Sequence, residues 1–146
     1  MKNVLVAVDL SQSAHAVVKR AREVADQFGG KLSIVHVLEY HPIVYGGSEF
    51  AVSLDSTVVE MFEKNARAAL KKLGAKIDVP ESRQYLEVDA VKQAIINLAE
   101  KLKVDLLVVG SHGRHGAGLL LGSTANAILH AAKCDVLAVR VGKSNK

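Results

Sequence analysis

The chain has 146 residues, of which 49% are apolar, and this is the usual size of one domain with one buried core. Its formal charge is +4, but the basic residues are scattered and only 4% of residues are aromatic, which argues against a nucleic-acid partner. We also expect no membrane partner, because no apolar run reaches the ~18 residues of a span. With no visible secretion signal and only Cys134 as a thiol, we expect a cytoplasmic protein without a disulfide framework.

Short apolar runs rich in Val, Ile and Leu predict parallel strands that are buried on both faces. They lie at Val4–Val8, Leu32–Leu38 and Val104–Val109. A more polar strand, suited to an exposed sheet edge, is expected at Ser82–Val88, and an apolar final strand at Asp135–Val141. We expect Cys134 to be a small packed residue just before that final strand.

Helical spacing of apolar residues alternates with these strands. The clearest helix begins at Ala14 and has its apolar face closed at Phe28, with Gly29-Gly30 as its C-cap. A second helix is expected from about Ser56 to Leu73, with Gly74 ending it. Its inward face is expected to comprise Val59, Phe62, Ala66, Ala69, Leu70 and Leu73.

Two shorter helices complete the pattern. One opens at Asp89, a good N-cap, and one begins near Ser123 and carries Ile128, Leu129 and Ala132. Strands alternating with helices predict an α/β fold: a doubly wound, open, five-stranded parallel sheet with helices on both faces, similar to a Rossmann fold. The apolar final strand would lie at an edge, where a second copy of the chain could cover it by antiparallel pairing.

We expect one domain over residues 1–146. The segment Glu39–Asp55 shows neither strand nor helix periodicity, and we interpret it as a flexible insertion, either a lid or a partner-contacting flap. The last residues, Gly142–Lys146, are expected to be a frayed tail.

A glycine-rich loop follows the strand that ends at Val109. Gly110, Gly113 and Gly122 would let backbone N–H groups approach an anion, and Ser123 and Thr124 would lie at the positive end of a helix. This pattern is typical of a phosphate site, although glycines that serve turns and a Ser123 that serves as an N-cap would explain it equally well. The loop has neither the lysine of a P-loop nor the third glycine of a dinucleotide fingerprint.

The full set of motifs resembles the universal stress protein family. The resemblance rests on Val8-Asp9-Leu10-Ser11, His36-Val37, Asp105–Gly113, Leu120–Thr124 and Asp135–Arg140, and it covers the whole chain. It implies strand order 3-2-1-4-5, a stress-responsive cytoplasmic protein without enzymatic activity, and a homodimer formed through the last strand. The implied dimer interface is Val136, Leu137, Ala138, Val139, Arg140 and Val141.

In the members that bind ATP, the resemblance implies that Asp9 faces the adenine or ribose and that the backbone of Val37 reads the adenine edge. The glycines, Ser123 and Thr124 would hold ribose and phosphates, with Mg²⁺ accompanying a triphosphate. The implied nucleotide-binding set is Ala7, Val8, Asp9, Val37, Val109, Gly110, His112, Gly113, Arg114, Gly122, Ser123, Thr124 and Ala125. No metal-ligand spacing occurs among the histidines, so no protein-bound metal site is expected.

The loop departs from the ATP-binding pattern, because the eight residues between Gly113 and Gly122 are one fewer than in that pattern. Leu86–Asp89 also replaces the usual glycine and proline. Two alternatives therefore stand beside ATP binding. One is a protein that acts only through an unknown protein partner. The other is a slow ATP hydrolase, which would need a water-positioning group such as His112 or Asp9.

Overall fold

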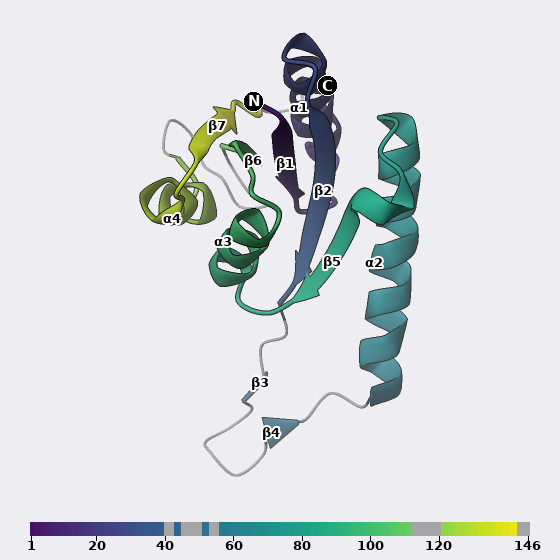
Figure 1. Ribbon diagram of the computed structural model, residues 1–146. Helices are drawn as coiled ribbons and strands as arrows, with labels where there is room; N and C mark the ends of the chain where they lie inside the picture. Colours follow the sequence, from purple (N-terminus) through teal and green to yellow (C-terminus); the bar gives the residue numbers. More distant parts are fainter. Residues whose placement is uncertain (40–42, 45–50, 53–55, 112–120, 143–146) are drawn as a thin grey trace.

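Five parallel strands form the central sheet of the protein, in the order β5-β2-β1-β6-β7. The computed structural model describes residues 1–39, 43–44, 51–52, 56–111 and 121–142 (Figure 1). The strands are β1 (Asn3–Val8), β2 (Lys31–Leu38), β5 (Gln84–Val88), β6 (Leu106–Gly110) and β7 (Asp135–Val139). This order confirms the predicted order 3-2-1-4-5, and it places the polar strand β5 and the final strand β7 at the two edges.

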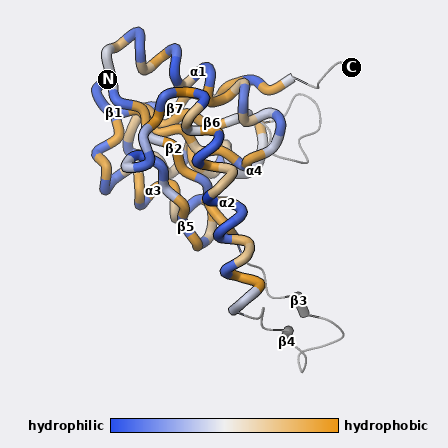
Figure 2. The backbone as a smooth tube through the Cα atoms, turned by 90° about the vertical axis from the view of Figure 1, so that its right-hand side faces the viewer, coloured by the Kyte–Doolittle hydropathy of each residue, from blue (hydrophilic) through white to orange (hydrophobic). Residues whose placement is uncertain are grey.

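Helices cover both faces of this sheet (Figure 1). Helices α1 (Ala14–Gln27) and α2 (Ser56–Lys76) pack on one face, and α3 (Val91–Lys101) and α4 (Ser123–Ala131) pack on the other. Because side chains alternate along a strand, β1 sends Val6 into the first layer and Leu5 into the second, and both are fully buried. The doubly wound fold is therefore confirmed, and Figure 2 shows the apolar residues concentrated along the strands.

Two short strands lie within the segment 39–55, where no regular element was predicted. They are β3 (Ile43–Val44) and β4 (Ala51–Val52), and they pair antiparallel as a separate two-stranded sheet. The other residues of the predicted insertion, except Glu39, lie outside the described residues, as does most of the predicted tail.

Gly74 does not end α2, which continues to Lys76. The prediction was wrong because this glycine serves a close approach between elements. A Cβ at Gly74 would lie 2.3 Å from Nε2 of Gln84, whose side chain packs there and donates a hydrogen bond of 2.8 Å to the Val79 carbonyl. The helix ends after Lys76, where the amides of Ile77 and Val79 both donate to the Gly74 carbonyl.

Other predicted boundaries also shift. Helix α3 begins at Val91 with Ala90 as its N-cap, so the prediction of Asp89 as the N-cap was wrong. The Asp89 carboxylate accepts a hydrogen bond from the neighbouring Ala90 amide instead of from the first turn of the helix, and the Asp89 amide donates to the Leu38 carbonyl at the end of β2. Helix α4 begins at Ser123 as predicted, but its N-cap is Gly122, so the interpretation of Ser123 as an N-cap was wrong. Strand β7 ends at Val139 rather than Val141.

Three apolar residues that the sequence analysis names in α2 and α4 are exposed, and two of them, Phe62 and Ala69, were predicted to face inward. Phe62 is 51% exposed because the first turns of α2 extend beyond the ends of the strands (Figure 1), and Ala69 also faces solvent. Leu129, on the outer side of α4, is 52% exposed. The inward contacts of these two helices are instead made by buried residues such as Leu70 and Ile128.

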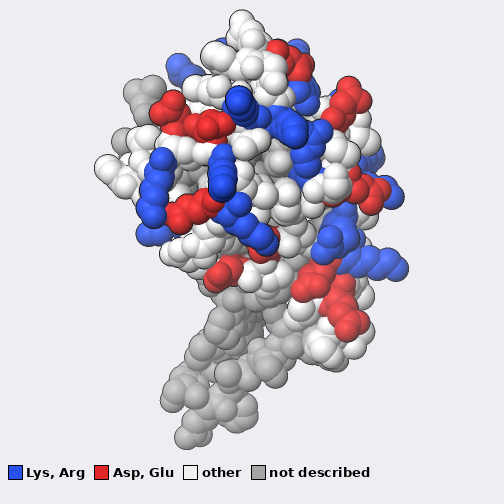
Figure 3. Space-filling model, viewed as in Figure 1, with Lys and Arg blue, Asp and Glu red and all other residues white. Residues whose placement is uncertain are grey.

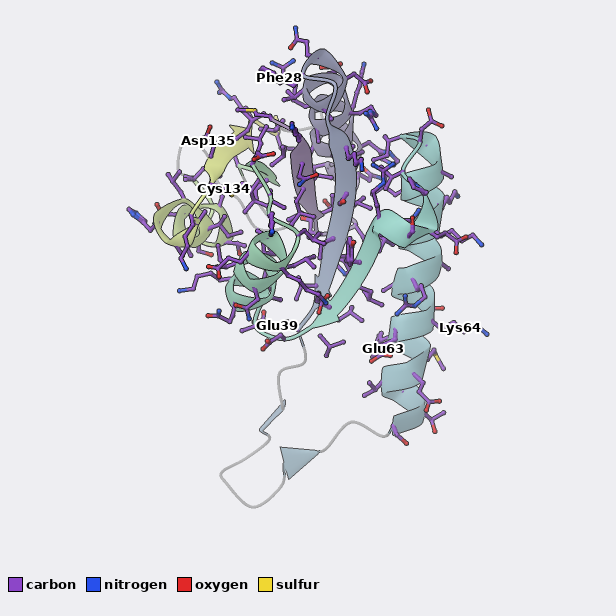
Figure 4. All side chains as sticks on the ribbon, in the orientation of Figure 1. Phe28, Glu39, Glu63, Lys64, Cys134 and Asp135 are labelled. Carbon is purple, nitrogen blue, oxygen red and sulfur yellow. The ribbon has the colours of Figure 1, made fainter. Side chains whose placement is uncertain are left out.

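Cys134 lies directly before β7 and packs, half-buried, against the α3/α4 layer, as predicted (Figure 4). Burial raises the pKa of its thiol above the usual 9.0, and the charge of the neighbouring Asp135 raises it further.

On the face seen in Figure 3, basic and acidic side chains are interspersed. Among the described residues, no helix is long and apolar enough to cross a membrane.

Candidate functional site

A cavity of about 410 Å³ opens at the carboxyl ends of β1, β2 and β6. Strands β1 and β6 are neighbours in the sheet, but the chain leaves β1 for α1 on one face and leaves β6 for α4 on the other. The strand order therefore reverses at this point. Parallel α/β sheets bind their ligands in the crevice that such a reversal creates.

The cavity brings together most of the residues that the sequence predicted for the site. The predicted residues that line it are Ala7, Val8, Asp9, Val37, Val109, Gly110, Gly122, Ser123, Thr124 and Ala125. The other predicted residues, His112, Gly113 and Arg114, lie outside the described residues. Sequence positions more than a hundred residues apart thus meet at one edge of the sheet.

Asp9 is held by the turn that leads from β1 into α1. Its Oδ1 accepts hydrogen bonds from the amide of Ser11 at 2.9 Å and from the Ser11 hydroxyl at 2.6 Å, and that hydroxyl lies 2.7 Å from the Ser13 hydroxyl. Leu10 adopts a positive φ of 60°, an uncommon conformation for a residue with a side chain. The turn thereby orients the carboxylate, and among the described residues nothing donates to Oδ2.

The amino end of α4 forms another wall of the cavity. Ser123 and Thr124 occupy its first turn, where backbone N–H groups have no partner within a helix. The Gly122 amide donates to the Ser111 carbonyl at 2.6 Å, which closes the base of the loop between β6 and α4. The Ser111 hydroxyl also accepts a hydrogen bond from the Val141 amide at 3.2 Å. Ser111 therefore fixes where α4 begins, a role that the sequence did not reveal.

Sequence reasoning missed several lining residues, most of which are apolar. They are Ser13, Ala14, Val17, Val35, His36, Val91, Ile95 and Ile128. The apolar ones were predicted only as core positions, because a helix face that packs on the sheet and one that borders a cavity have the same spacing. Ser13 and His36 stand close to strand ends in the sequence, and this was the signal that could have identified them.

The arrangement suits a ligand with distinct apolar and polar ends. Asp9 is the only acidic or basic side chain, apart from His36, among the described residues that line the cavity. Its carboxylate can accept hydrogen bonds from ligand hydroxyl or amino groups, whereas the amino end of α4 favours an anion. The apolar walls can enclose a ring. No group of three potential metal ligands occurs among the described residues.

Comparison with known proteins agrees with this architecture. The profile of the universal stress protein family matches residues 1–140. The chain belongs to the universal stress protein family. A universal stress protein A homolog from Coxiella burnetii is 49% identical over 138 residues, which cover 94% of this chain and 95% of that protein.

Solved structures of universal stress proteins share the fold. One, described as a complex with cAMP, is 27% identical, has a TM-score of 0.69, and the match covers 97% of this chain and 98% of that one. Another, from Lactobacillus plantarum, is 22% identical with a TM-score of 0.76, and the match covers 95% and 97% of the two chains.

Proposed function

We propose that this universal stress protein is a non-enzymatic stress-response protein that binds an adenine nucleotide, such as ATP, in the cavity at the ends of β1, β2 and β6. The observation that carries the proposal is the joining, in one cavity of about 410 Å³, of apolar walls, an oriented carboxylate and the amino end of a helix. A nucleotide has the matching parts: an aromatic base, ribose hydroxyls and phosphates.

Different parts of the cavity suit different parts of a nucleotide. Val37, Val91 and Ile95 provide apolar surface for the base. Oδ2 of Asp9 would accept a hydrogen bond from a ribose hydroxyl, and the N–H groups and hydroxyls of Ser123 and Thr124 would bind phosphate. A triphosphate would bring Mg²⁺ through its own oxygens. The related protein in complex with cAMP supports an adenine nucleotide as the ligand class.

Two measurements test this proposal directly. Nucleotide released by denaturing freshly purified protein should be detected by chromatography, and titration with ATP or cAMP should give binding heat. Protein that carries no nucleotide and gives no heat with either ligand would refute the proposal. Phosphate release from ATP should stay at the no-protein background, and release above it would instead support the slow hydrolase.

Ser123→Glu separates phosphate binding from helix stability. A negative charge at the first residue of α4 favours the helix dipole by about 0.3–1 kcal/mol, so the fold should be retained. The same charge repels phosphate, and ATP affinity should fall at least tenfold. Ser56→Glu is a matched control because it adds the same charge to the first residue of α2, which does not line the cavity. Unchanged ATP affinity in Ser123→Glu would remove α4 from the phosphate site.

A second candidate function is protein interaction without nucleotide. It is favoured by the loop before Gly122, which is one residue shorter than the ATP-binding pattern. One residue spans up to ~3.5 Å, about the length of a hydrogen bond, so the difference can alter phosphate contacts. Insertion of one residue after Gly116 should then create ATP affinity that the natural chain lacks. Equal ATP affinity with and without the insertion would count against this candidate.

A further inference from the structure

His36 is the one titratable side chain other than Asp9 among the described residues that line the cavity. It lies near the end of β2, directly opposite Val8 of β1, and its Nδ1 is 2.7 Å from the Val8 carbonyl oxygen. A carbonyl oxygen only accepts hydrogen bonds, so Nδ1 must carry the proton. In the neutral ring, Nε2 is then an unprotonated acceptor.

Nε2 remains free to respond to a ligand. It has no hydrogen-bond partner among the described residues. In that part of the chain, Nε of Arg22 is the only buried side-chain polar atom without a hydrogen bond. Nε2 of His36 is therefore not fully buried, and it is accessible from the cavity or from solvent. The tether to Val8 holds the ring in place, and protonation would occur at Nε2 without breaking it.

The elements packed around His36 supply little other charge. Asp9 is the charged group contributed by the end of β1. Helix α1 presents the uncharged Ser13, Ala14 and Val17 to the cavity, and β5 places Leu86 opposite His36. On α2, the side that faces the sheet carries the buried Leu70 and Leu73, and also Glu63 (Figure 4).

We propose that His36 determines ligand specificity in this cavity: when protonated at Nε2 it favours phosphate-bearing nucleotides over the corresponding neutral nucleoside, so nucleotide affinity rises as the pH falls. This inference rests on the proposed nucleotide site and adds the residue that regulates it. A cation within the cavity offsets the negative charge of Asp9 and attracts the anionic ligand, whereas neutral imidazole does neither.

The test uses cAMP and adenosine as probes, titrated calorimetrically into the full chain at about pH 5.5 and about pH 7.5. The phosphodiester of cAMP stays anionic across this range, so any change reports the protein. Affinity for cAMP should rise several-fold at the lower pH. Affinity for adenosine should not rise.

His36→Asn is the informative variant, because its amide can still donate to the Val8 carbonyl but cannot gain a proton. It should bind cAMP with the same affinity at both pH values. His36→Gln provides a second non-titrating variant if His36→Asn is unstable. His15→Asn is the matched control, since His15 is exposed on α1 and does not line the cavity, and Glu63→Gln controls for the carboxylate on α2. Both controls should keep the pH dependence.

Equal cAMP affinity at the two pH values in the natural protein would overturn the proposal, as would a pH dependence that survives in His36→Asn and His36→Gln but is lost in His112→Asn or His115→Asn. Long-range ¹H–¹⁵N spectra of the free protein should show the Nδ1–H tautomer, and an Nε2–H tautomer would also overturn it. Absence of ATP and cAMP binding at both pH values would refute the proposed function itself, whereas binding without pH dependence refutes this inference alone.

Discussion

At the scale of single residues, Asp105 shows how one residue, through its side chain and its backbone, joins three segments of the chain. Its Oδ2 accepts hydrogen bonds from the backbone amides of Lys2 at 2.7 Å and Asn3 at 2.8 Å. Its own amide donates to the Asn3 carbonyl, and its carbonyl accepts from the amide of Asp135. Asp105 therefore joins the starts of β1, β6 and β7, at the end of the sheet opposite the cavity.

These hydrogen bonds lower the pKa of the Asp105 carboxyl from its usual 3.8, the amide of Asn3 first and that of Lys2 second. Because the folded-state pKa is depressed, the stabilisation is complete above the unfolded-state value of about 3.9 and is lost as the pH falls through the folded value. Asp105→Asn should therefore lower the urea midpoint at pH 7, and the difference from the natural protein should shrink as the pH falls below about 3.9. A difference that is constant with pH would show that the charge does not matter.

At the scale of elements, α2 shows how a neighbouring strand, β5, overrides the tendency of a glycine to end a helix. Glycine inside a helix usually lowers stability by about 0.5–1 kcal/mol relative to alanine. At Gly74 the absence of a Cβ instead makes room for Gln84, whose side chain binds the Val79 carbonyl. The close approach fastens the last turn of α2 to the start of β5.

Gly74→Ala should therefore fail to stabilise the protein, because the new Cβ displaces the Gln84 side chain. In a Gln84→Ala background the obstacle is gone, and the same substitution should stabilise the fold by up to about 1 kcal/mol. Urea unfolding of the four proteins of this double-mutant cycle measures the coupling. If Gly74→Ala has the same effect in both backgrounds, the close approach is not what requires glycine.

At the scale of the whole molecule, β7 forms one edge of the sheet, and no strand in the described part of the chain pairs with its outer side. The amide of Asp135 and the carbonyl of Val139 bond toward β6, so alternation along the strand directs the backbone groups of Val136 and Ala138 outward. Leu137 and Val139 pack against the α1/α2 layer and Val136 against the α3/α4 layer. Dimerisation through β7 remains a prediction, and it would rest mainly on backbone hydrogen bonds.

Ala138→Pro tests that prediction, because it removes an outward N–H while leaving the hydrogen bonds between β6 and β7 intact. If β7 pairs with a second copy, the variant should be monomeric by light scattering under conditions in which the natural protein is dimeric. Ala138→Thr keeps the N–H and is the matched control, which should remain dimeric. A dimer that persists in Ala138→Pro would place the interface elsewhere.

The strands were predictable because local signals and the tertiary structure agree there, whereas their order was an expectation from the family resemblance, which the structure confirms. Val4–Val8 and Leu32–Leu38 are apolar at nearly every position, and only a parallel sheet covered on both faces buries such runs. Predicted helix boundaries were wrong where residues distant in the sequence make contact. The Leu38 carbonyl accepts a hydrogen bond from the Asp89 amide, and the Gln84 side chain packs against Gly74.

The candidate site divides in the same way. Asp9, Gly110 and Ser123 could be assigned from the sequence alone, since strand ends, glycines and helix starts are local features whose chemistry is visible in the residue type. The cavity itself, and the places of Ala14, Val91 and Ile95 in its wall, were decided only by the tertiary structure. A residue that packs and a residue that borders a cavity have the same periodicity, and only the positions of neighbouring elements distinguish them.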